Sequence, residues 1–330
     1  MIAASFNPSR MNDLRRSALF IFTLVVACGD NADAPTGATG TGTGGAGADG
    51  GAGAGTGGDG GGPACGDGIV QLPEVCDDGN ATSGDGCHGC EQVETLTTSD
   101  AGFGCVVLTD AQLECWGNGA FGVLGQGDEQ DRGDEPNEMG DDLPFIDLGA
   151  GRTVIQAVAA GQRACAILDD RSVRCWGRNN NGQAGLGDTA HRGDNPSEMG
   201  NALPAVDLGT GRTARWLSAS GLHACALLDD FSVKCWGTND FGQLGSGSTQ
   251  GHGGGPGQMG DALPVVDLGT GRTATAIVSG DDHNCAILDD ETVKCWGGNG
   301  FGQLGLGDTN NRGDEPGEMG DLLPTVDLGA

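Results

Sequence analysis

The last 60 residues of the chain carry their hydrophobic positions in four short runs. The first run, at 274–279, is rich in β-branched residues, and the runs at 283–289 and 292–297 flank a tight turn. A fourth run occupies 323–328. The i, i+3, i+4 spacing of an amphipathic helix is absent, and Gly-rich turns separate the runs. We therefore expect four short strands that form one antiparallel sheet.

The same pattern occurs four times with a period of sixty residues. Cysteines, Trp-Gly pairs, prolines and Leu-Pro pairs all recur at this step without an insertion or deletion. A strict period of this length indicates a supersecondary unit that is repeated and packs against its neighbours. The sequence thus predicts, over 93–330, an all-β fold of four β-propeller-type blades with four antiparallel strands each, as a closed ring or an incomplete propeller. The units are 91–150, 151–210, 211–270 and 271–330.

Each unit contains two cysteines ten positions apart, on the two arms of the predicted hairpin. In the last unit the arms are symmetric about Asp290, which places the cysteines opposite one another. Cross-strand neighbours lie at a Cα distance that a disulfide can bridge. Buried reduced thiols are the alternative, but thirteen cysteines indicate an oxidising compartment. We predict the disulfides Cys105–Cys115, Cys165–Cys175, Cys225–Cys235 and Cys285–Cys295.

A tryptophan follows the second cysteine of every unit and begins a longer motif. Strand alternation places it on the opposite sheet face from that cysteine, where we expect it to pack between blades; a ligand-stacking platform is the alternative. The stretch W-G-x-N-x-x-G-Q-L-G-x-G-D at 296–308, with G-x-x-H-x-C-A-x-L upstream, resembles the regulator of chromosome condensation repeat. The resemblance implies a β-propeller with one four-stranded blade per repeat.

Members of that family usually close their ring with seven blades, whereas this chain has four repeats. The alternatives are a truncated gene product, an open arc or half of an assembly. An open arc exposes apolar blade faces, which favours dimerisation or aggregation. Some family members outside bacteria exchange the nucleotide of a small GTPase. We do not carry that activity over to an acidic, exported chain with too few blades.

The N-terminus has the features of an export signal. Arg15 and Arg16 precede an uncharged run at 18–27, which is too short for a transmembrane helix and fits a signal-peptide core. The small residues before Cys28 resemble the lipobox of bacterial lipoproteins, which implies cleavage before Cys28 and its acylation. We interpret 1–28 as this signal; an ordinary secretory signal is the alternative. The expected location is the outer membrane or cell surface, through a lipid anchor in the membrane, or else the extracellular space.

Two further segments separate the signal from the repeats. Residues 29–64 are Gly-rich and lack the apolar residues of a core, so we expect a disordered linker. Residues 65–92 closely resemble the myxobacterial cysteine-rich disulfide repeat, with the pairing open among three connectivities. Its cysteines are Cys65, Cys76, Cys87 and Cys90. Calcium binding by this segment is an alternative, although the EF-hand template does not fit. The oxygen ligands of the calcium ion would be Asp67, Asp77, Asp78, Asn80 and Asp85.

The charge of the chain limits its partners. Asp and Glu number 46 against 16 Lys and Arg, a formal charge of −30, which disfavours nucleic acid and anionic membrane surfaces. Much of this acid lies in a loop of roughly 25 residues between Trp-Gly and Leu-Pro of each unit. We interpret the loops as solvated surface, with a Ca²⁺ site or a surface for a cationic protein as alternatives. Arg-Gly-Asp triplets at 132–134, 192–194 and 312–314 come with the repeat.

The sequence contains no catalytic signature. None of its five histidines forms an i, i+4 metal pair, and no nucleophile elbow, P-loop or dinucleotide fingerprint occurs. We therefore expect a lipid-anchored, non-enzymatic binding module for an unknown protein partner, without a small-molecule cofactor. The alternatives are a calcium-stabilised structural surface protein and a propeller-based secreted enzyme. Guanine nucleotide exchange of the family type is the least favoured function.

Overall fold

The structure, a computed structural model, describes residues 93–329. The signal peptide with Cys28, the Gly-rich linker and the cysteine-rich segment with its calcium alternative lie outside the described residues. Within 93–329 no helix is long and apolar enough to cross a membrane.

Each sixty-residue unit forms one three-stranded antiparallel sheet, in which the strands follow one another in sequence order. The fold class is therefore confirmed as all-β with propeller-type blades. The sheets are β1 (Val93–Thr98), β2 (Phe103–Leu108) and β3 (Leu113–Gly117); β4 (Val154–Ala160), β5 (Arg163–Leu168) and β6 (Val173–Gly177); β7 (Ala214–Ala219), β8 (His223–Leu228) and β9 (Val233–Gly237); and β10 (Ala274–Ser279), β11 (His283–Leu288) and β12 (Val293–Gly297). Short 3-10 turns complete the elements: η2 (Ala120–Gly122), η3 (Gly140–Asp142), η4 (Gly200–Ala202), η5 (Gly260–Ala262) and η6 (Gly320–Leu322).

The hairpin of each blade brings its two cysteines directly opposite one another. In the last blade Cys285 of β11 pairs with Cys295 of β12, and the flanking residues pair in register. The two Cα atoms are 4.1 Å apart and the sulfurs are bonded. The same cross-strand disulfide joins the hairpins of the other three blades, as Cys105–Cys115, Cys165–Cys175 and Cys225–Cys235.

The fourth run of each unit differs from the expected full strand. In the last unit Val326 N donates to Val293 O at 2.8 Å, and only an isolated bridge between Lys294 and Thr325 accompanies this bond. Pro324 explains the short contact, because proline has no N–H to donate and is confined to sheet edges. Each blade therefore has three full strands and one edge segment.

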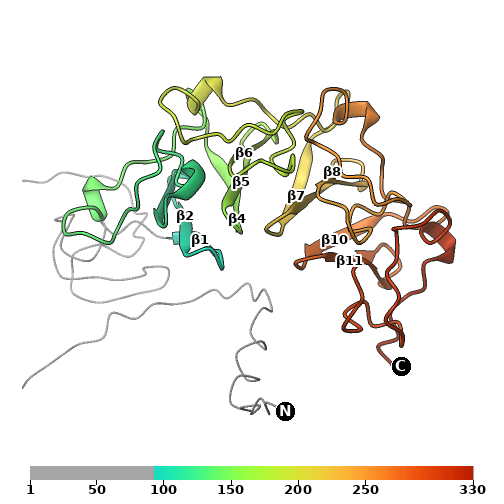
Figure 1. The fold of residues 1–330 in the computed structure, drawn as a ribbon. Helices are drawn as coiled ribbons and strands as arrows, with labels where there is room; N and C mark the ends of the chain where they lie inside the picture. Colours follow the sequence, from blue (N-terminus) through green and yellow to red (C-terminus); the bar gives the residue numbers. More distant parts are fainter. Residues whose placement is uncertain (1–92, 330) are drawn as a thin grey trace, which may run out of the picture. The chain divides into compact units, whose positions relative to one another are not determined.

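The hydrophobic core lies between the blades. At the junction of the last two blades Cys225, Leu227 and Val233 pack against Ala286 and Leu288. Equivalent clusters fill the two earlier junctions. The first strands of successive blades contact each other and line the inner side of the arc that the four sheets form (Figure 1). Because each blade buries its faces against its neighbours, stability is shared along the array.

Three of the four repeat tryptophans connect consecutive blades, as the sequence predicted, whereas Trp116 of the first blade is only partly buried. Trp176, Trp236 and Trp296 are fully buried. Each indole Nε1 donates to a backbone carbonyl of the preceding blade, as in the bond from Trp296 to Gln243 O at 3.1 Å. Trp236 and Trp176 make the same contact with Gln183 O and Val123 O. A buried indole with its N–H satisfied is a packing element, and no face is left for a ligand.

Candidate functional site: the long-loop surface

The long loops between the third strand and the edge segment are organised around a buried asparagine. In the second unit the Asn179 side chain is fully buried; its Nδ2 donates to Asp188 O and Ala190 O, both at 3.0 Å. Its Oδ1 accepts from Ala184 N at 2.8 Å. Asn239 and Asn299 hold the third and fourth loops in the same way. The asparagine of the W-G-x-N motif thus gives the loop a fixed conformation, because it replaces backbone hydrogen bonds that no regular element provides.

Neighbouring long loops pack on one another through glycines. Gly182 has a φ of +73°, and a Cβ placed there would lie 2.1 Å from the backbone nitrogen of Gly254 in the next unit. Gly187 N donates to Gly253 O across the same junction at 2.9 Å. Only glycine permits both this backbone conformation and this approach. The long loops therefore form a continuous surface at one end of the blades.

Several of the loop carboxylates form hydrogen bonds inside their own loops. Asp308 accepts from Arg312 Nη2 at 2.6 Å. Hydrogen bonds, first from the Asn310 backbone N–H and then from Arg312, hold the pKa of Asp308 below its ordinary value. Glu318 Oε2 accepts from the backbone N–H groups of Gly313 and Glu315, at 2.9 and 3.0 Å. Corresponding bonds occur in the first and second units, through Asp128, Glu138, Asp188 and Glu198.

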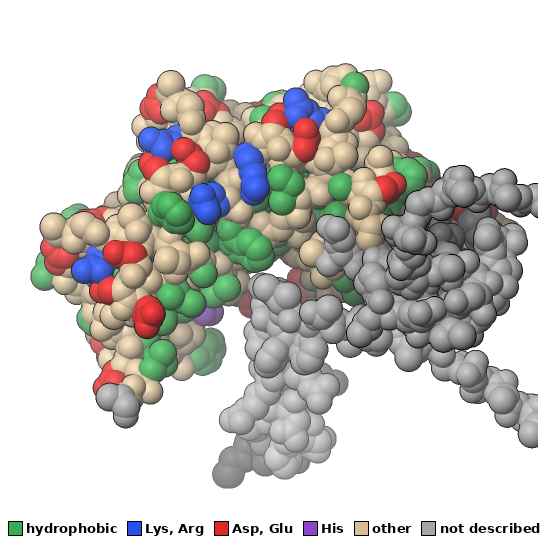
Figure 2. All heavy atoms as spheres, turned by 180° about the vertical axis from the view of Figure 1, so that it is seen from behind, with side chains coloured by type: hydrophobic (Ala, Val, Ile, Leu, Met, Phe, Trp, Pro, Cys, Tyr) green, Lys and Arg blue, Asp and Glu red, His purple; other side chains and the backbone are tan. Residues whose placement is uncertain are grey.

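The third unit makes the same loop with uncharged groups. Ser248 and His252 occupy the positions of the aspartate and arginine, and Gln258 occupies that of the glutamate. Gly255 N donates to Gln258 Oε1 at 2.8 Å, and Asn239 Nδ2 donates to Ser248 O at 2.6 Å. Gln258 therefore caps the third loop as Glu198 and Glu318 cap theirs. Figure 2 shows acidic side chains dispersed over the visible face with basic ones among them.

The Arg-Gly-Asp triplets belong to this internal hydrogen bonding. Arg132, Arg192 and Arg312 each form an ion pair with the aspartate four residues earlier. The guanidinium of Arg312 also donates to the carbonyls of Asn310 and Asn311, both at 2.9 Å. The arginine of the triplet is thus bound to its own loop.

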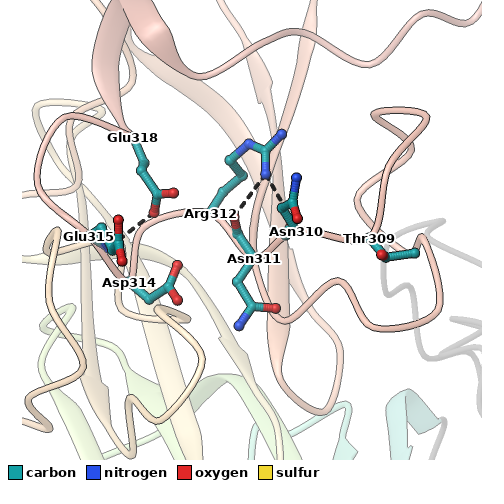
Figure 3. Close-up of a pocket in the computed structure, with 7 residues that line it drawn as sticks. All are labelled: Thr309, Asn310, Asn311, Arg312, Asp314, Glu315 and Glu318. Atoms are coloured by element: carbon teal, nitrogen blue, oxygen red, sulfur yellow. Dashed lines mark hydrogen bonds between the residues drawn. The ribbon is translucent and has the colours of Figure 1, made fainter.

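An open depression of about 620 Å³ lies on the fourth loop (Figure 3). Arg312 crosses it to reach its carbonyl partners, and the Asn311 side chain accepts from Asn299 N at 3.0 Å. The depression is polar and shallow, without an apolar wall to enclose a small molecule. It is lined by Thr309, Asn310, Asn311, Arg312, Asp314, Glu315 and Glu318.

A serine–histidine pair in the described residues has the distances of a nucleophile and its base. Ser220 Oγ lies 2.8 Å from His223 Nδ1, and His223 Nε2 lies 2.9 Å from Asn284 Oδ1. All three side chains are buried at the junction of the last two blades. Burial lowers the pKa of His223 to about 4. A base must reach substrate to act, so this network fastens two blades together. In the same residues no group of three or more His, Cys, Asp or Glu side chains is placed to hold a metal.

Sequence reasoning did not identify a second buried polar group, Arg163. Its side chain is 1% exposed and donates to Ser220 O and His223 O of the next blade, at 2.9 and 3.0 Å. It also donates to Gln183 O. Burial lowers the pKa of Arg163 to about 9. The repeat position was visible, because Phe103, His223 and His283 occupy it in the other units, but residue type alone does not indicate burial.

Two family models match the chain. The regulator of chromosome condensation (RCC1) repeat matches residues 154–183, 217–243 and 274–303. These matches lie in the second to fourth units; the first unit has Gly119 and Val123 where the others have the motif asparagine and glutamine. A domain of unknown function (DUF4215) matches residues 62–91, which include the four cysteines of the cysteine-rich segment.

Curated relatives share these repeats. The chain is 28% identical over 214 residues to the ultraviolet-B receptor UVR8 of Arabidopsis thaliana, over 63% of this chain and 42% of the receptor. It is 27% identical to a probable E3 ubiquitin-protein ligase, HERC4 of Rattus norvegicus, over 61% of this chain and 17% of the ligase. The chain therefore spans less than half the length of these relatives.

Solved structures share the fold. Yeast RCC1 (Prp20), solved with Kap60 bound, aligns with a TM-score of 0.52 at 19% identity, over 72% of this chain and 50% of that chain. Prp20p of Saccharomyces cerevisiae aligns with a TM-score of 0.50 at 16% identity, over 68% of this chain and 50% of that chain. At this identity the likeness concerns the fold.

Proposed function

Because the chain carries RCC1-type propeller repeats, we propose that it is a non-enzymatic protein-binding module, exported and lipid-anchored, which presents its long-loop surface to a protein partner at the cell envelope. The repeat type supports the binding part, since propellers of this kind serve interaction. Among the solved neighbours, yeast RCC1 (Prp20) was crystallised bound to Kap60.

The observation that carries the proposal is the construction of the long loops. Buried asparagines and capped backbone N–H groups hold each loop in one conformation, and glycine contacts join neighbouring loops into one surface. A surface that is ordered before binding loses little conformational entropy when a partner docks.

Export and anchoring are supported by the sequence and by the disulfides. Arg15, Arg16 and the uncharged run at 18–27 have the form of a signal, and Cys28 follows it as an acylation residue would. Every blade contains one disulfide, and disulfides persist in oxidising compartments. A double or triple acylation at Cys28 would anchor the chain firmly.

The test reverses charge on the long-loop surface and at the opposite end of the blades. The loop variant carries Glu135→Lys and Glu315→Lys, two exposed positions whose side chains are outside the internal capping bonds described above. The control is Glu291→Lys, an exposed residue in the hairpin turn at the other end. Each protein is expressed in its native cell, crosslinked in place and captured, and bound proteins are identified by mass spectrometry.

We expect a partner that wild type and the Glu291→Lys control capture equally and that the loop variant loses. Capture of the same proteins by all three would place binding elsewhere. Absence of any enriched protein would count against a binding function. Near-ultraviolet circular dichroism of each variant verifies that its blades are folded.

A further inference from the structure

The hairpin turn between the second and third strands of each blade carries a side chain at a position that favours glycine. Ala111, Arg171, Phe231 and Glu291 occupy this position in the four blades, and their φ angles lie between +64° and +68°. A bulky residue with such a φ angle is an outlier, because its Cβ crowds the neighbouring backbone. Strained residues of this kind cluster at functional sites. The turns therefore share one backbone conformation and present side chains that differ in size and charge.

In the third blade the turn residue belongs to an exposed group of aromatic and cationic side chains. Phe231 is 39% exposed, and the guanidinium carbon of Arg215 lies 4.5 Å from the centre of its ring. Trp216 follows Arg215 in β7 and is 40% exposed. Ala214 N donates to Arg171 O at 3.0 Å, which places the turn of the second blade beside the start of β7. We define the turn patch as Arg171, Arg215, Trp216 and Phe231.

The arginines of the turn patch are exposed, and within 93–329 neither of them forms an ion pair. The carboxylates of the two turns are already bound by other arginines of their own blades. Those ion pairs join Arg152 to Asp169 and Asp170, and Arg212 to Asp229 and Asp230, at 2.8–3.2 Å. On a chain with a formal charge of −30, the patch therefore offers two guanidinium groups to a partner.

We propose that the turn patch binds an acidic segment of a protein partner, in which carboxylates flank an apolar side chain. The carboxylates pair with the two arginines, because a planar guanidinium can donate two parallel hydrogen bonds to one carboxylate. The apolar side chain packs on Phe231 and Trp216, whose rings offer a large contact area for few rotatable bonds. Tryptophan and arginine are also enriched among the residues that contribute most to binding energies at protein interfaces.

The surroundings of the patch favour a short protein segment over an acidic polysaccharide. Arg215 already covers one face of the Phe231 ring, whereas a sugar needs an open face on which to stack. A long polyanion that crosses several blades is repelled by the turn of the last blade, which carries Asp289, Asp290 and Glu291. A short segment reaches the two arginines without contacting that turn.

Fluorescence anisotropy with the purified full chain tests the proposal. The probes are short fluorescein-labelled peptides in which glutamates flank a central leucine or phenylalanine, and counterparts in which glutamine replaces every glutamate. We expect the acidic peptides to bind at least about tenfold more tightly than the glutamine counterparts, and this difference to shrink as sodium chloride screens the charges. Unlabelled acidic peptide should also change the emission of Trp216, which is exposed while Trp176, Trp236 and Trp296 are fully buried.

Phe231→Gly separates binding from folding, because glycine adopts a φ angle of +64° without strain. This variant should keep the melting temperature of wild type and bind the acidic peptides about tenfold or more weakly. The matched control is Glu291→Gly, at the same position of the last blade, where φ is +68°. It relieves the same strain and leaves the turn patch intact, so its peptide binding should equal that of wild type. Arg215→Gln should weaken binding of the acidic peptides more than that of the glutamine peptides.

The remaining outcomes overturn the proposal. Acidic peptides that bind no better than their glutamine counterparts show that the patch does not recognise carboxylates. Equal binding by Phe231→Gly and wild type places the peptide elsewhere on the chain. Binding of polygalacturonate that Phe231→Gly weakens, without binding of the peptides, identifies an acidic polysaccharide as the ligand.

The variant with Glu135→Lys and Glu315→Lys distinguishes a failure of this proposal from a failure of the proposed function. The turn patch and the long-loop surface lie at opposite ends of the blades, because β9 leads from the turn to the long loop. At about 0.15 M sodium chloride, charges further apart than about 8 Å are largely screened. The variant should therefore bind the acidic peptides as wild type does, and a changed affinity would place the acidic segment on the long-loop surface.

Discussion

The buried histidine at the junction of the last two blades makes the fold sensitive to acid. His223 is fully buried and its ring nitrogens bond to Ser220 and Asn284. Its pKa falls from 6.5 to about 4, chiefly because burial disfavours the charged form, and the nearby charges of Arg163 and His283 lower it further. The folded protein therefore keeps this imidazole neutral at a pH where the unfolded chain is already protonated.

The stability that His223 contributes is present above pH 6.5 and is lost as the pH falls towards the folded-state pKa. The unfolded chain takes up the proton first, so the free energy of unfolding decreases by about 1.4 kcal/mol per pH unit in this window. The difference between 6.5 and about 4 corresponds to a loss of about 3 kcal/mol. This loss is comparable with a large fraction of the stability of an ordinary domain.

Urea unfolding between pH 7 and pH 4.5, followed by tryptophan fluorescence, measures the effect. We expect His223→Gln to be less stable than wild type at pH 7 and to show a flatter dependence on pH. The control variant is His283→Gln, which replaces a histidine that is only partly buried and whose pKa burial also lowers. The pH dependence of the free energy of unfolding should change less in this variant than in His223→Gln. An unchanged slope in His223→Gln would refute the reasoning, since the proton uptake would then occur elsewhere.

Three further predictions concern the blades and the anchor. Replacing both Cys285 and Cys295 by Ala should cost about 2–3 kcal/mol in thermal unfolding, because the disulfide closes a short loop; eight alkylatable blade thiols in gently purified protein would contradict this. Asn179→Ala should lower the free energy of unfolding by about 2–4 kcal/mol, because it removes three hydrogen bonds of the loop. Substituting its exposed neighbour, Asn180→Ala, should change stability little. Equal losses in the two variants would show that the buried asparagine does not hold the loop. Cys28→Ser should move the chain from the membrane fraction to the soluble fraction of native cells, and an unchanged distribution would exclude acylation there.

The periodic sequence predicted most of the fold, because it repeats the same physical constraints four times. The runs at 274–279 and 283–289 correspond closely to β10 and β11, and the symmetric cysteines define the hairpin register. Trp176, Trp236 and Trp296 pack between blades because strand alternation turns them away from the disulfide. The fourth strand was overestimated, since Pro324 removes a donor at its beginning and one backbone bond remains.

The polar interior of the loops could not be predicted from single residues. Asn179 and Arg163 belong to residue types that are usually exposed, and their burial depends on carbonyls that only the folded blades bring together. The loop carboxylates were interpreted as solvated surface, and the sequence did not show that some of them also cap the loop. Glu318 accepts from backbone N–H groups a few residues away, which become donors only once the loop has turned.

The uncharged third loop has a consequence for how such arrays diversify and how they can be engineered. Its serine, histidine and glutamine replace an aspartate, an arginine and a glutamate, and Gln258 caps the loop in place of the glutamate. In the charged loops the aspartate and the arginine should therefore be exchanged together, because either one alone would lose its ion-pair partner. A new loop surface can be introduced into a blade if the glycines that contact the neighbouring loop are kept.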